Sequence, residues 1–370
     1  MTTASLRTED FNYDLPESSI AQEPMMPRDH CKLLVMNRTD NTLEHRHFYD
    51  IVDYFDAGDL LVVNDTRVLP ARLQGKRADT GGAVEVLLLK ELDADTHTWE
   101  CLVKPGKRVR EGVELAFFGA EDVPSTSPSD EPCLSGTVVE VGDEGLRSIR
   151  FAAADEDFHA AIHKLGTLPL PPYIKDYAGE QDLYQTVYAR QDKEHSAAAP
   201  TAGLHFTPEL LQQLQDKGVE IARVRLDVGL DTFRPVSEDD PTAHHIHTEY
   251  FQVPAAAAGA VNAAHDRGNK VVAVGTTVVR ALESAAALTG SAHIEAQGAP
   301  TSLYILPGYD FQVVDALITN FHVPKSTLVM MISAFVDTEH GRERTLAAYA
   351  EAVEEGYRFL SFGDAMLIWS

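Results

Sequence analysis

The sequence predicts an α/β domain that is interrupted by an all-β insert. Apolar, strand-like runs alternate with helical segments before about residue 67 and again after residue 151, which is typical of a largely parallel sheet covered by helices. Between them, short segments separated by turn residues predict evenly spaced antiparallel strands in a small barrel or sandwich. We therefore expect a discontinuous α/β domain at 1–66 and 152–370 and an inserted domain at 67–151.

The first part of the α/β domain lies in residues 33–63. They read as a strand, an amphipathic helix and a second strand after the turn Gly58-Asp59, from the segments LLVM, FYDIVDYF and LLVV. The insert follows with ARLQGKR, AVEVLLLKEL, TWECLVK, VELAFFG, GTVVEVG and LRSIRF. Helix and strand patterns alternate again afterwards in TPELLQQLQDKG, VEIARVRLDV, PAAAAGAVNAAHDRG, KVVAVGTT and a helix through Ala285.

Composition excludes several classes of protein. With 370 residues and 44% hydrophobic content, the chain is long enough for two packed units. The N-terminal residues contain no apolar signal region, and no stretch approaches about 20 apolar residues, so we expect neither export nor a membrane span. Cys31, Cys101 and Cys133 form no CxxC pair, which argues against a disulfide framework and a thiolate zinc site. We expect a cytoplasmic protein.

The charge distribution bears on nucleic-acid binding. A net charge of −26, from 31 basic and 57 acidic residues, argues against a polyanionic partner. Residues 67–110, however, carry nine basic and six acidic side chains. A local basic face can meet phosphate once salt screens more distant charges. If the partner is RNA, we expect the contacts from Lys104, Lys107, Arg108 and Arg110.

The segment AAAPTAGLHFTPELL at 197–211 is the first candidate site. Thr207 and Pro208 form a helix start, whose free N–H groups suit a carboxylate or phosphate. Thr201, Gly203 and His205 precede it and are candidate substrate-binding and catalytic residues. A simple capped connection explains the same pattern.

The segment KVVAVGTTVVRALESAA is the second candidate. It runs from an apolar strand through a Gly-Thr-Thr turn into a helix, and ligands bind at such strand ends in open α/β sheets. Thr276, Arg280 and Glu283 are the candidate binding residues. The segment is neither a GxGxxG fingerprint nor a P-loop. An exposed i,i+3 ion pair between Arg280 and Glu283 is the structural alternative.

Histidines cluster in TAHHIHTEYF at 242–251. On a strand, His244 points away from His245 and His247, and no HExxH or cysteine companion exists, so we expect no metal site. His247 and Glu249 are better interpreted as a hydrogen-bonded acid/base pair, because imidazole titrates near neutrality and a carboxylate fixes its tautomer.

Three further strand ends carry polar residues. Asp65, Thr66 and Arg67 follow a buried strand and lead into the insert, where they either line a cleft between domains or form a hydrogen-bonded turn. Asn320 ends the apolar strand of VVDALITNFHVPKS. Asp364, in FGDAMLI, is either a cap or a carboxylate that faces a ligand amine.

From about Phe11 to the C-terminus the chain resembles the S-adenosylmethionine:tRNA ribosyltransferase-isomerase family of queuosine biosynthesis. Ten motifs in order carry the resemblance: FNYDLPESSIAQEP, GDLLVVNDTRVLPARL, GGAVEVLLL, PLPPYI, DLYQTVYA, AAPTAGLHFT, HTEYF, GNKVVAVGTTVVRALESAA, VDALITNFHVPKSTLVMMISAF and FGDAMLI. The resemblance implies an α/β domain with an inserted antiparallel β-barrel.

The resemblance also implies a reaction. The ribosyl moiety of S-adenosylmethionine moves onto 7-aminomethyl-7-deazaguanine at the tRNA wobble position, which yields epoxyqueuosine-tRNA, adenine and methionine. S-adenosylmethionine is then a consumed substrate, and we expect no cofactor and a monomer. The chemistry needs proton transfer, for which His205 and His247 are candidates. Asp65, Glu283 and Asp364 are candidates for the sulfonium or amine, and Arg280 for the carboxylate.

One departure from the family pattern leaves alternatives open. Where the family reads HVGxGTF this chain has DVGLDTF, so that Asp227 replaces the histidine and Asp231 the second glycine. His195 also stands where the family usually has glycine. An aspartate cannot replace an imidazole, and glycine is favoured where φ is positive. A relative that acts on another acceptor, or a non-catalytic RNA-binding module, are the alternatives.

Overall fold

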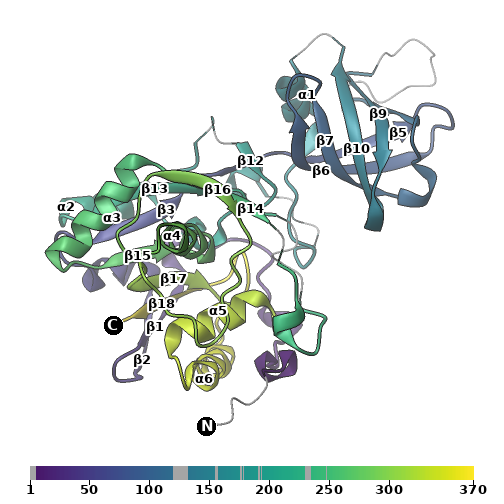
Figure 1. Ribbon diagram of the computed structural model, residues 1–370. Coiled ribbons are helices and arrows are strands. Elements are labelled where there is room, and N and C mark those ends of the chain that lie inside the picture. The colour runs from purple at the N-terminus through teal and green to yellow at the C-terminus, as the bar shows by residue number, and fades with distance from the viewer. Residues whose placement is uncertain are drawn as a thin grey trace. The chain divides into compact units, whose positions relative to one another are not determined.

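The protein consists of two compact units (Figure 1). The computed structural model describes residues 6–119, 132–154, 157–175, 177, 179–190, 192, 194–229, 235–246 and 248–370. The first unit comprises Met1–Arg67, Pro171–Lys193 and Ala199–Ser370, and the second comprises Val68–Leu170 and Glu194–Ala198. Within the described part of the chain, none of the helices has the length and hydrophobicity that a membrane crossing requires.

The first unit is built on a nine-stranded mixed sheet. Its strand order is β16 (Gln297–Thr301), β14 (Glu249–Val253), β13 (Glu220–Leu226), β3 (Leu60–Asn64), β15 (Val271–Val274), β17 (Ala316–Asn320), β18 (Ala365–Trp369), β1 (Lys32–Asn37) and β2 (Leu43–His47). The four central strands β13, β3, β15 and β17 are parallel. The expectation of a largely parallel sheet is therefore correct for the centre and for the pair β18–β1, whereas β14, β16 and β2 run antiparallel to each neighbour they pair with, and β18 runs antiparallel to β17.

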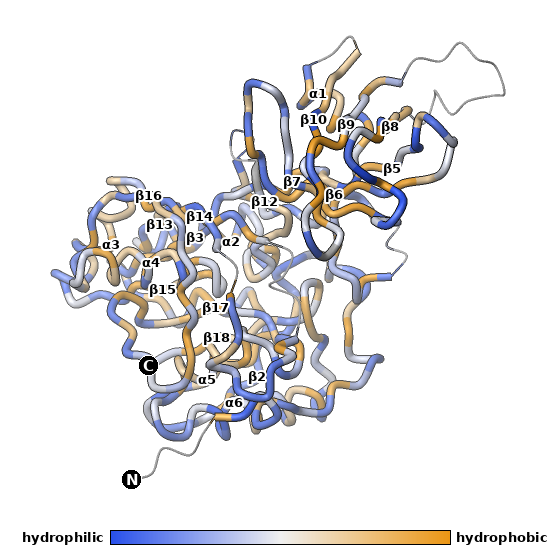
Figure 2. The backbone as a smooth tube through the Cα atoms, turned by 45° about the vertical axis from the view of Figure 1, so that its right-hand side comes forward, coloured by the Kyte–Doolittle hydropathy of each residue, from blue (hydrophilic) through white to orange (hydrophobic). Residues whose placement is uncertain are grey.

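Burial explains why three of the four central strands show no alternation of apolar and polar residues. Strands β3, β15 and β17 are buried along their whole length, as is usual for parallel strands with both faces covered. Figure 2 colours the backbone by hydropathy, with hydrophobic residues in orange. This burial leaves only the strand ends for polar side chains, and the candidate site lies there.

The helices begin and end at residues that the sequence marks. They are α2 (Pro208–Asp216), α3 (Ala255–Arg267), α4 (Thr276–Thr289), α5 (Thr327–Val336) and α6 (Gly341–Glu354). The Thr207 hydroxyl caps α2 by accepting from the Leu210 N–H at 3.1 Å, and Ser326 caps α5 in the same way. The segment FYDIVDYF, expected as an amphipathic helix, forms a 3₁₀-helix over Phe48–Tyr54. This helix is seven residues long and is wound more tightly than an α-helix.

The second unit is a closed antiparallel barrel. Its strands, in order, are β5 (Arg72–Arg77), β6 (Ala83–Asp93), β7 (Thr98–Lys104), β10 (Leu146–Ala153), β9 (Leu134–Val141) and β8 (Glu114–Phe117), and β8 pairs with β5 to close it. Gly75 lies at this closure, where a Cβ atom would come within 2.6 Å of the Phe117 ring. The expected barrel is confirmed.

The barrel unit extends further than the expected boundary at residue 151. It continues to Leu170 through α1 (Phe158–Leu165) and the short strand β11 (Gly166–Thr167), which pairs with β5. The Phe158 ring packs on Phe151 and on His97, so this helix completes the barrel core. Residues Glu194–Ala198 also belong to this unit, and β12 (Glu194–Ser196) pairs with β4 (Arg67–Val68).

Candidate active site

The site lies where the four central parallel strands end. Asn64 closes β3 and is fully buried. Its Oδ1 accepts from the backbone N–H groups of Thr66 and Leu226, both at 3.2 Å, and its Nδ2 donates to the Leu226 carbonyl at 2.9 Å. One amide therefore joins the carboxyl ends of β3 and β13 and holds the floor of the site.

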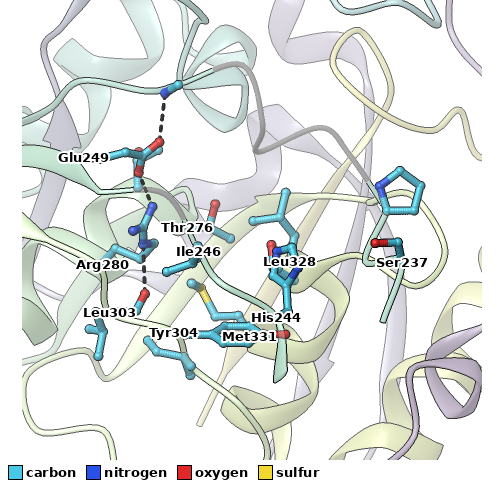
Figure 3. A pocket seen from close by; sticks show the side chains of 15 residues that line it. Ser237, His244, Ile246, Glu249, Thr276, Arg280, Leu303, Tyr304, Leu328 and Met331 are labelled. Atoms are coloured by element: carbon cyan, nitrogen blue, oxygen red, sulfur yellow. Dashed lines mark hydrogen bonds and ion pairs between the residues drawn. The ribbon is translucent and has the colours of Figure 1, made fainter. Parts of the chain in front are cut away.

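A pocket of about 180 Å³ opens at this edge (Figure 3). It is lined by Gly229, Pro235, Ser237, His244, Ile246, Glu249, Thr276, Thr277, Arg280, Leu303, Tyr304, Ile305, Thr327, Leu328 and Met331. A smaller cavity shares Thr276, Thr277 and Leu328 with it and adds Thr201 and Asn320. The structure thus brings together five of the predicted residues: Thr201, Glu249, Thr276, Arg280 and Asn320.

A buried ion pair forms one wall of the pocket. The Arg280 side chain is 6% exposed, and its Nη1 donates to Glu249 Oε2 while its Nε donates to the Leu303 carbonyl at 3.2 Å (Figure 3). Glu249 Oε1 in turn accepts from the Gly229 N–H at 2.8 Å. Arg280 Nη2 is buried and has no hydrogen-bond partner among the described residues. A buried guanidinium N–H without a partner is costly, so a bound acceptor would relieve it.

The start of α4 adds a second source of positive potential. Gly275 precedes the helix with a φ of 88°, a conformation that glycine adopts without strain. Thr276 and Thr277 are the first two helical residues and line the pocket, and Arg280 follows one turn later. Helix N-termini carry partial positive charge and unsatisfied N–H groups. This end of the pocket is therefore suited to a carboxylate or phosphate.

Another part of the pocket lining is apolar. It includes Ile246, Leu303, Leu328 and Met331, with the ring of Tyr304 among them (Figure 3). Ile305 also belongs to this lining. Most of these come from the segment after β16 and from the buried helix α5. The combination of an anion-binding end and an apolar wall fits a ligand with a carboxylate at one end and a hydrophobic body.

His205 is buried outside the pocket, and both of its ring nitrogens have partners. Burial, followed by the charges of Arg358 and Arg28, lowers its pKa to about 3, so the imidazole is neutral near pH 7. Asn320 Nδ2 donates to its Nε2 at 3.1 Å, which places the ring proton on Nδ1, 3.3 Å from Cys31 Sγ. Asn320 Oδ1 accepts from the Thr201 hydroxyl at 3.0 Å. His205 thus orients Asn320 and Thr201 and is not itself placed in the pocket.

Two predicted carboxylates accept hydrogen bonds from backbone N–H groups and do not line the pocket. Glu283 is fully buried and accepts from the N–H groups of Gln312, Val313 and Val314 at 2.9 to 3.1 Å. Asp364 accepts from the Lys32 and Arg358 N–H groups at 3.0 and 2.7 Å. Burial raises the pKa of both carboxyls. Neither lines the pocket, so the expectation that they meet a ligand cation is not supported.

The remaining predicted residues line neither the pocket nor the smaller cavity. The Thr66 hydroxyl donates to Asp227 at 3.3 Å, and Asp65 is buried beside it. Arg67 pairs with Asp182 at 3.5 Å. Gly203 serves packing, since a Cβ atom there would lie 1.9 Å from the Tyr188 hydroxyl.

The departures from the family pattern are partly resolved. Asp227 receives two hydrogen bonds from the Arg225 guanidinium, at 2.7 and 2.6 Å, and so does not face the pocket as an unpaired charge. Asp231 and the predicted catalytic His247 lie outside the described residues, as does the side chain of His195. Among the described residues, no group of three or more His, Cys, Asp or Glu side chains is arranged to hold a metal ion.

Sequence reasoning missed one pair of residues at the pocket. His244 lines it, and His244 Nδ1 lies 2.9 Å from Glu238 Oε2. The two residues flank a short 3₁₀ turn, η12 (Pro241–Ala243), which begins with the Asp240 cap. Asp240 as a cap, followed by proline, is a sequence signal for a turn that brings Glu238 close to His244. The assumption of a strand instead placed His244 on the face opposite His245 and His247.

The predicted RNA-binding residues are on the barrel. Lys104, Lys107, Arg108 and Arg110 are exposed around the turn that follows β7. The buried Arg147 guanidinium lies beneath this turn and donates to the carbonyls of Gly106 and Val109 at 2.6 and 2.7 Å. The basic turn is therefore held in shape by the barrel core.

Comparisons with known proteins agree on one family. The model of the family described as queuosine biosynthesis protein matches residues 8–368. A protein of Moorella thermoacetica named S-adenosylmethionine:tRNA ribosyltransferase-isomerase is 52% identical over 98% of this chain and 100% of its own length. One of the same name from Symbiobacterium thermophilum is 50% identical with the same coverage. The crystal structure of S-adenosylmethionine tRNA ribosyltransferase from Thermotoga maritima is 37% identical, with a TM-score of 0.53, and the match covers 97% of this chain and 99% of that one.

Proposed function

The chain belongs to the queuosine biosynthesis protein family, and from this premise we propose that it is an S-adenosylmethionine:tRNA ribosyltransferase-isomerase. It transfers and isomerises the ribosyl moiety of S-adenosylmethionine onto 7-aminomethyl-7-deazaguanine at the wobble position of tRNA. The products are epoxyqueuosine-tRNA, adenine and methionine. S-adenosylmethionine is a consumed substrate, and no further cofactor takes part. The enzyme acts as a monomer in the cytoplasm.

The buried Arg280 supplies the main support from the structure. S-adenosylmethionine ends in an amino-acid carboxylate, and Arg280 Nη2 is a buried donor without a hydrogen-bond partner among the described residues. The first N–H groups of α4 lie on the same side of the pocket through Thr276 and Thr277. A guanidinium and a helix N-terminus together bind a carboxylate well. We therefore place the methionine carboxylate at Arg280.

The apolar wall then takes the rest of the donor. Leu303, Ile305, Leu328 and Met331 offer a surface for the carbons around the sulfonium and for the adenine, and Tyr304 offers an aromatic ring. Apolar walls with a few polar groups at one end are typical of small-molecule sites. Thr201 and Asn320, in the smaller adjoining cavity, are positioned to hydrogen-bond the ribose hydroxyls.

The tRNA is bound through the basic turn of the barrel. Lys104, Lys107, Arg108 and Arg110 provide four exposed cations there. The net charge of −26 does not prevent this, because salt screens charges beyond about 10 Å while close contacts persist.

Adenine release tests the proposal directly. Purified protein is incubated with S-adenosylmethionine and an anticodon stem-loop that carries the aminomethyl deazaguanine, and adenine is measured by chromatography. A stem-loop with guanine at the wobble position is the matched control. Adenine that appears only with the modified stem-loop supports the proposal. Adenine released with a different acceptor, or RNA retention without adenine, would overturn it in favour of a diverged transferase or a binding module.

A further inference from the structure

A histidine that lines the pocket forms a dyad with a carboxylate. His244 lines the pocket together with Tyr304 and Leu328 (Figure 3). Its Nδ1 lies 2.9 Å from Glu238 Oε2, and the two side chains are 24% and 37% exposed. Glu238 is not among the pocket-lining residues. The imidazole therefore lines the pocket, and the carboxylate that binds it does not.

This geometry determines which nitrogen is available for chemistry. A carboxylate is an acceptor, so Nδ1 carries the proton and donates it to Glu238. Nε2 is then left with a lone pair in the neutral ring, and within the described residues it has no hydrogen-bond partner. A hydrogen bond from its own backbone N–H, followed by the one with His244, lowers the pKa of Glu238, so the carboxylate is ionised near neutrality. This is the arrangement of an oriented general base.

The side chains around His244 are less suited than its imidazole to accept a proton. From the segment after β16, the Tyr304 ring meets the imidazole edge at a centroid distance of 5.9 Å, and burial raises the pKa of Tyr304 to about 12. Helix α5 contributes the uncharged Leu328 and Met331. Across the pocket, Glu249 is engaged by Arg280. Near neutral pH, the phenol stays protonated and the carboxylate stays paired.

We infer that His244 is the general base of the ribosyl transfer and that Glu238 positions it, an inference that rests on the proposed function. Nε2 takes a proton from the ribose carbon that is bonded to the sulfonium sulfur. The C–H bond breaks and its electron pair stays on that carbon beside the positive sulfur, while a new N–H bond forms. The neutral imidazole becomes a cation, which the Glu238 carboxylate stabilises. The sulfonium becomes an overall neutral ylide, so charge and protons balance.

Substitution of His244 tests the inference against a matched neighbour. His244→Gln removes the base, and we expect kcat for adenine release to fall by about 100-fold or more. Binding of S-adenosylhomocysteine, measured by calorimetry, should change little, because Gln retains a polar side chain of similar size. His245→Gln is the control, since His245 is exposed and does not line the pocket. Retention of wild-type kcat in His244→Gln would overturn the inference.

The pH profile of Glu238→Gln provides a readout that a purely structural pair would not move. Activity should rise with pH as the base loses its proton. Loss of the carboxylate destabilises the imidazolium, so the acid limb should shift to lower pH while maximal kcat falls. An acid limb that stays in place would overturn the inference. If the wild-type protein releases no adenine, the proposed function fails; if both it and His244→Gln release adenine equally, only this inference fails.

Discussion

Replacement of Arg280 by lysine isolates the donor that we assign to the substrate carboxylate. Lysine keeps the positive charge beside Glu249 but offers one compact ammonium in place of a planar fork. The Glu249 side chain is only 6% exposed, and a buried carboxylate left unpaired costs about 3 to 5 kcal/mol. The ammonium will therefore stay with Glu249, and no N–H group remains at the position of Arg280 Nη2, where we place the ligand carboxylate.

The expected loss follows from one charge-assisted hydrogen bond. Such a bond contributes about 1.5 to 3 kcal/mol, which corresponds to a rise of about 10- to 150-fold in KM for S-adenosylmethionine. Because the carboxylate is remote from the reacting carbon, kcat should change little. The bond from Arg280 Nε to the Leu303 carbonyl is also lost, which should lower the free energy of unfolding by about 1 kcal/mol.

Steady-state kinetics of adenine release, with calorimetric binding of S-adenosylhomocysteine, measure the effect. Arg344→Lys is the control, because Arg344 also forms a bonded guanidinium, to Asp337 and to the Arg38 carbonyl, but does not line the pocket. The control should lose stability without a change in KM. A folded Arg280→Lys protein with wild-type KM would refute the carboxylate assignment.

Three further predictions concern the barrel, pH and His205. Lys107→Glu combined with Arg108→Glu should weaken tRNA binding and reduce the slope of log K against log salt by roughly one unit per lost phosphate contact. Lys90→Glu with Arg150→Glu, on the barrel strands, is the control. Unchanged filter binding of tRNA by the Lys107/Arg108 variant would remove the basic turn from the interface. The hydrogen bond to Asp315 raises the pKa of His265, so its stabilisation is complete below about pH 6.5 and is lost as pH rises through the folded pKa. The difference in unfolding free energy between wild type and His265→Gln should therefore shrink from pH 6 to pH 8, and a constant difference in urea titrations would contradict this. His205→Leu should lower kcat/KM by roughly fivefold through the lost bond to Asn320, yet leave the acid limb of the pH profile in place, since the pKa of His205 is about 3; a shifted limb would mean that His205 does carry protons.

Several parts of the site were predictable from local pattern. Apolar strands that end in Gly-Thr-Thr or in asparagine predict ligand-facing groups, because parallel strands have their carboxyl ends at one edge. Thr276, Arg280 and Asn320 lie at that edge as expected. The barrel insert was predictable for the same reason, since its strands are short and separated by turn residues.

Other residues have functions that depend on packing from distant segments. Arg280 and Glu283 lie one turn apart on α4, yet only Arg280 meets the pocket, because the N–H groups of 312–314 surround Glu283. The sequence suggests His205 for proton transfer, whereas packing turns its two ring nitrogens toward Cys31 and Asn320 and not into the pocket. No local spacing reports such an environment.

The sequence by itself determined the order of elements, the position of the insert and the edge at which polar residues gather, because strand and helix periodicity and chain direction are local properties. Only the tertiary structure decided which polar groups at that edge have a donor or acceptor without a hydrogen-bond partner among the described residues. That distinction separates Arg280 Nη2 and His244 Nε2 from Glu283 and Asp364. Its physical reason is that hydrogen-bond satisfaction and desolvation depend on atoms contributed by residues far apart along the chain.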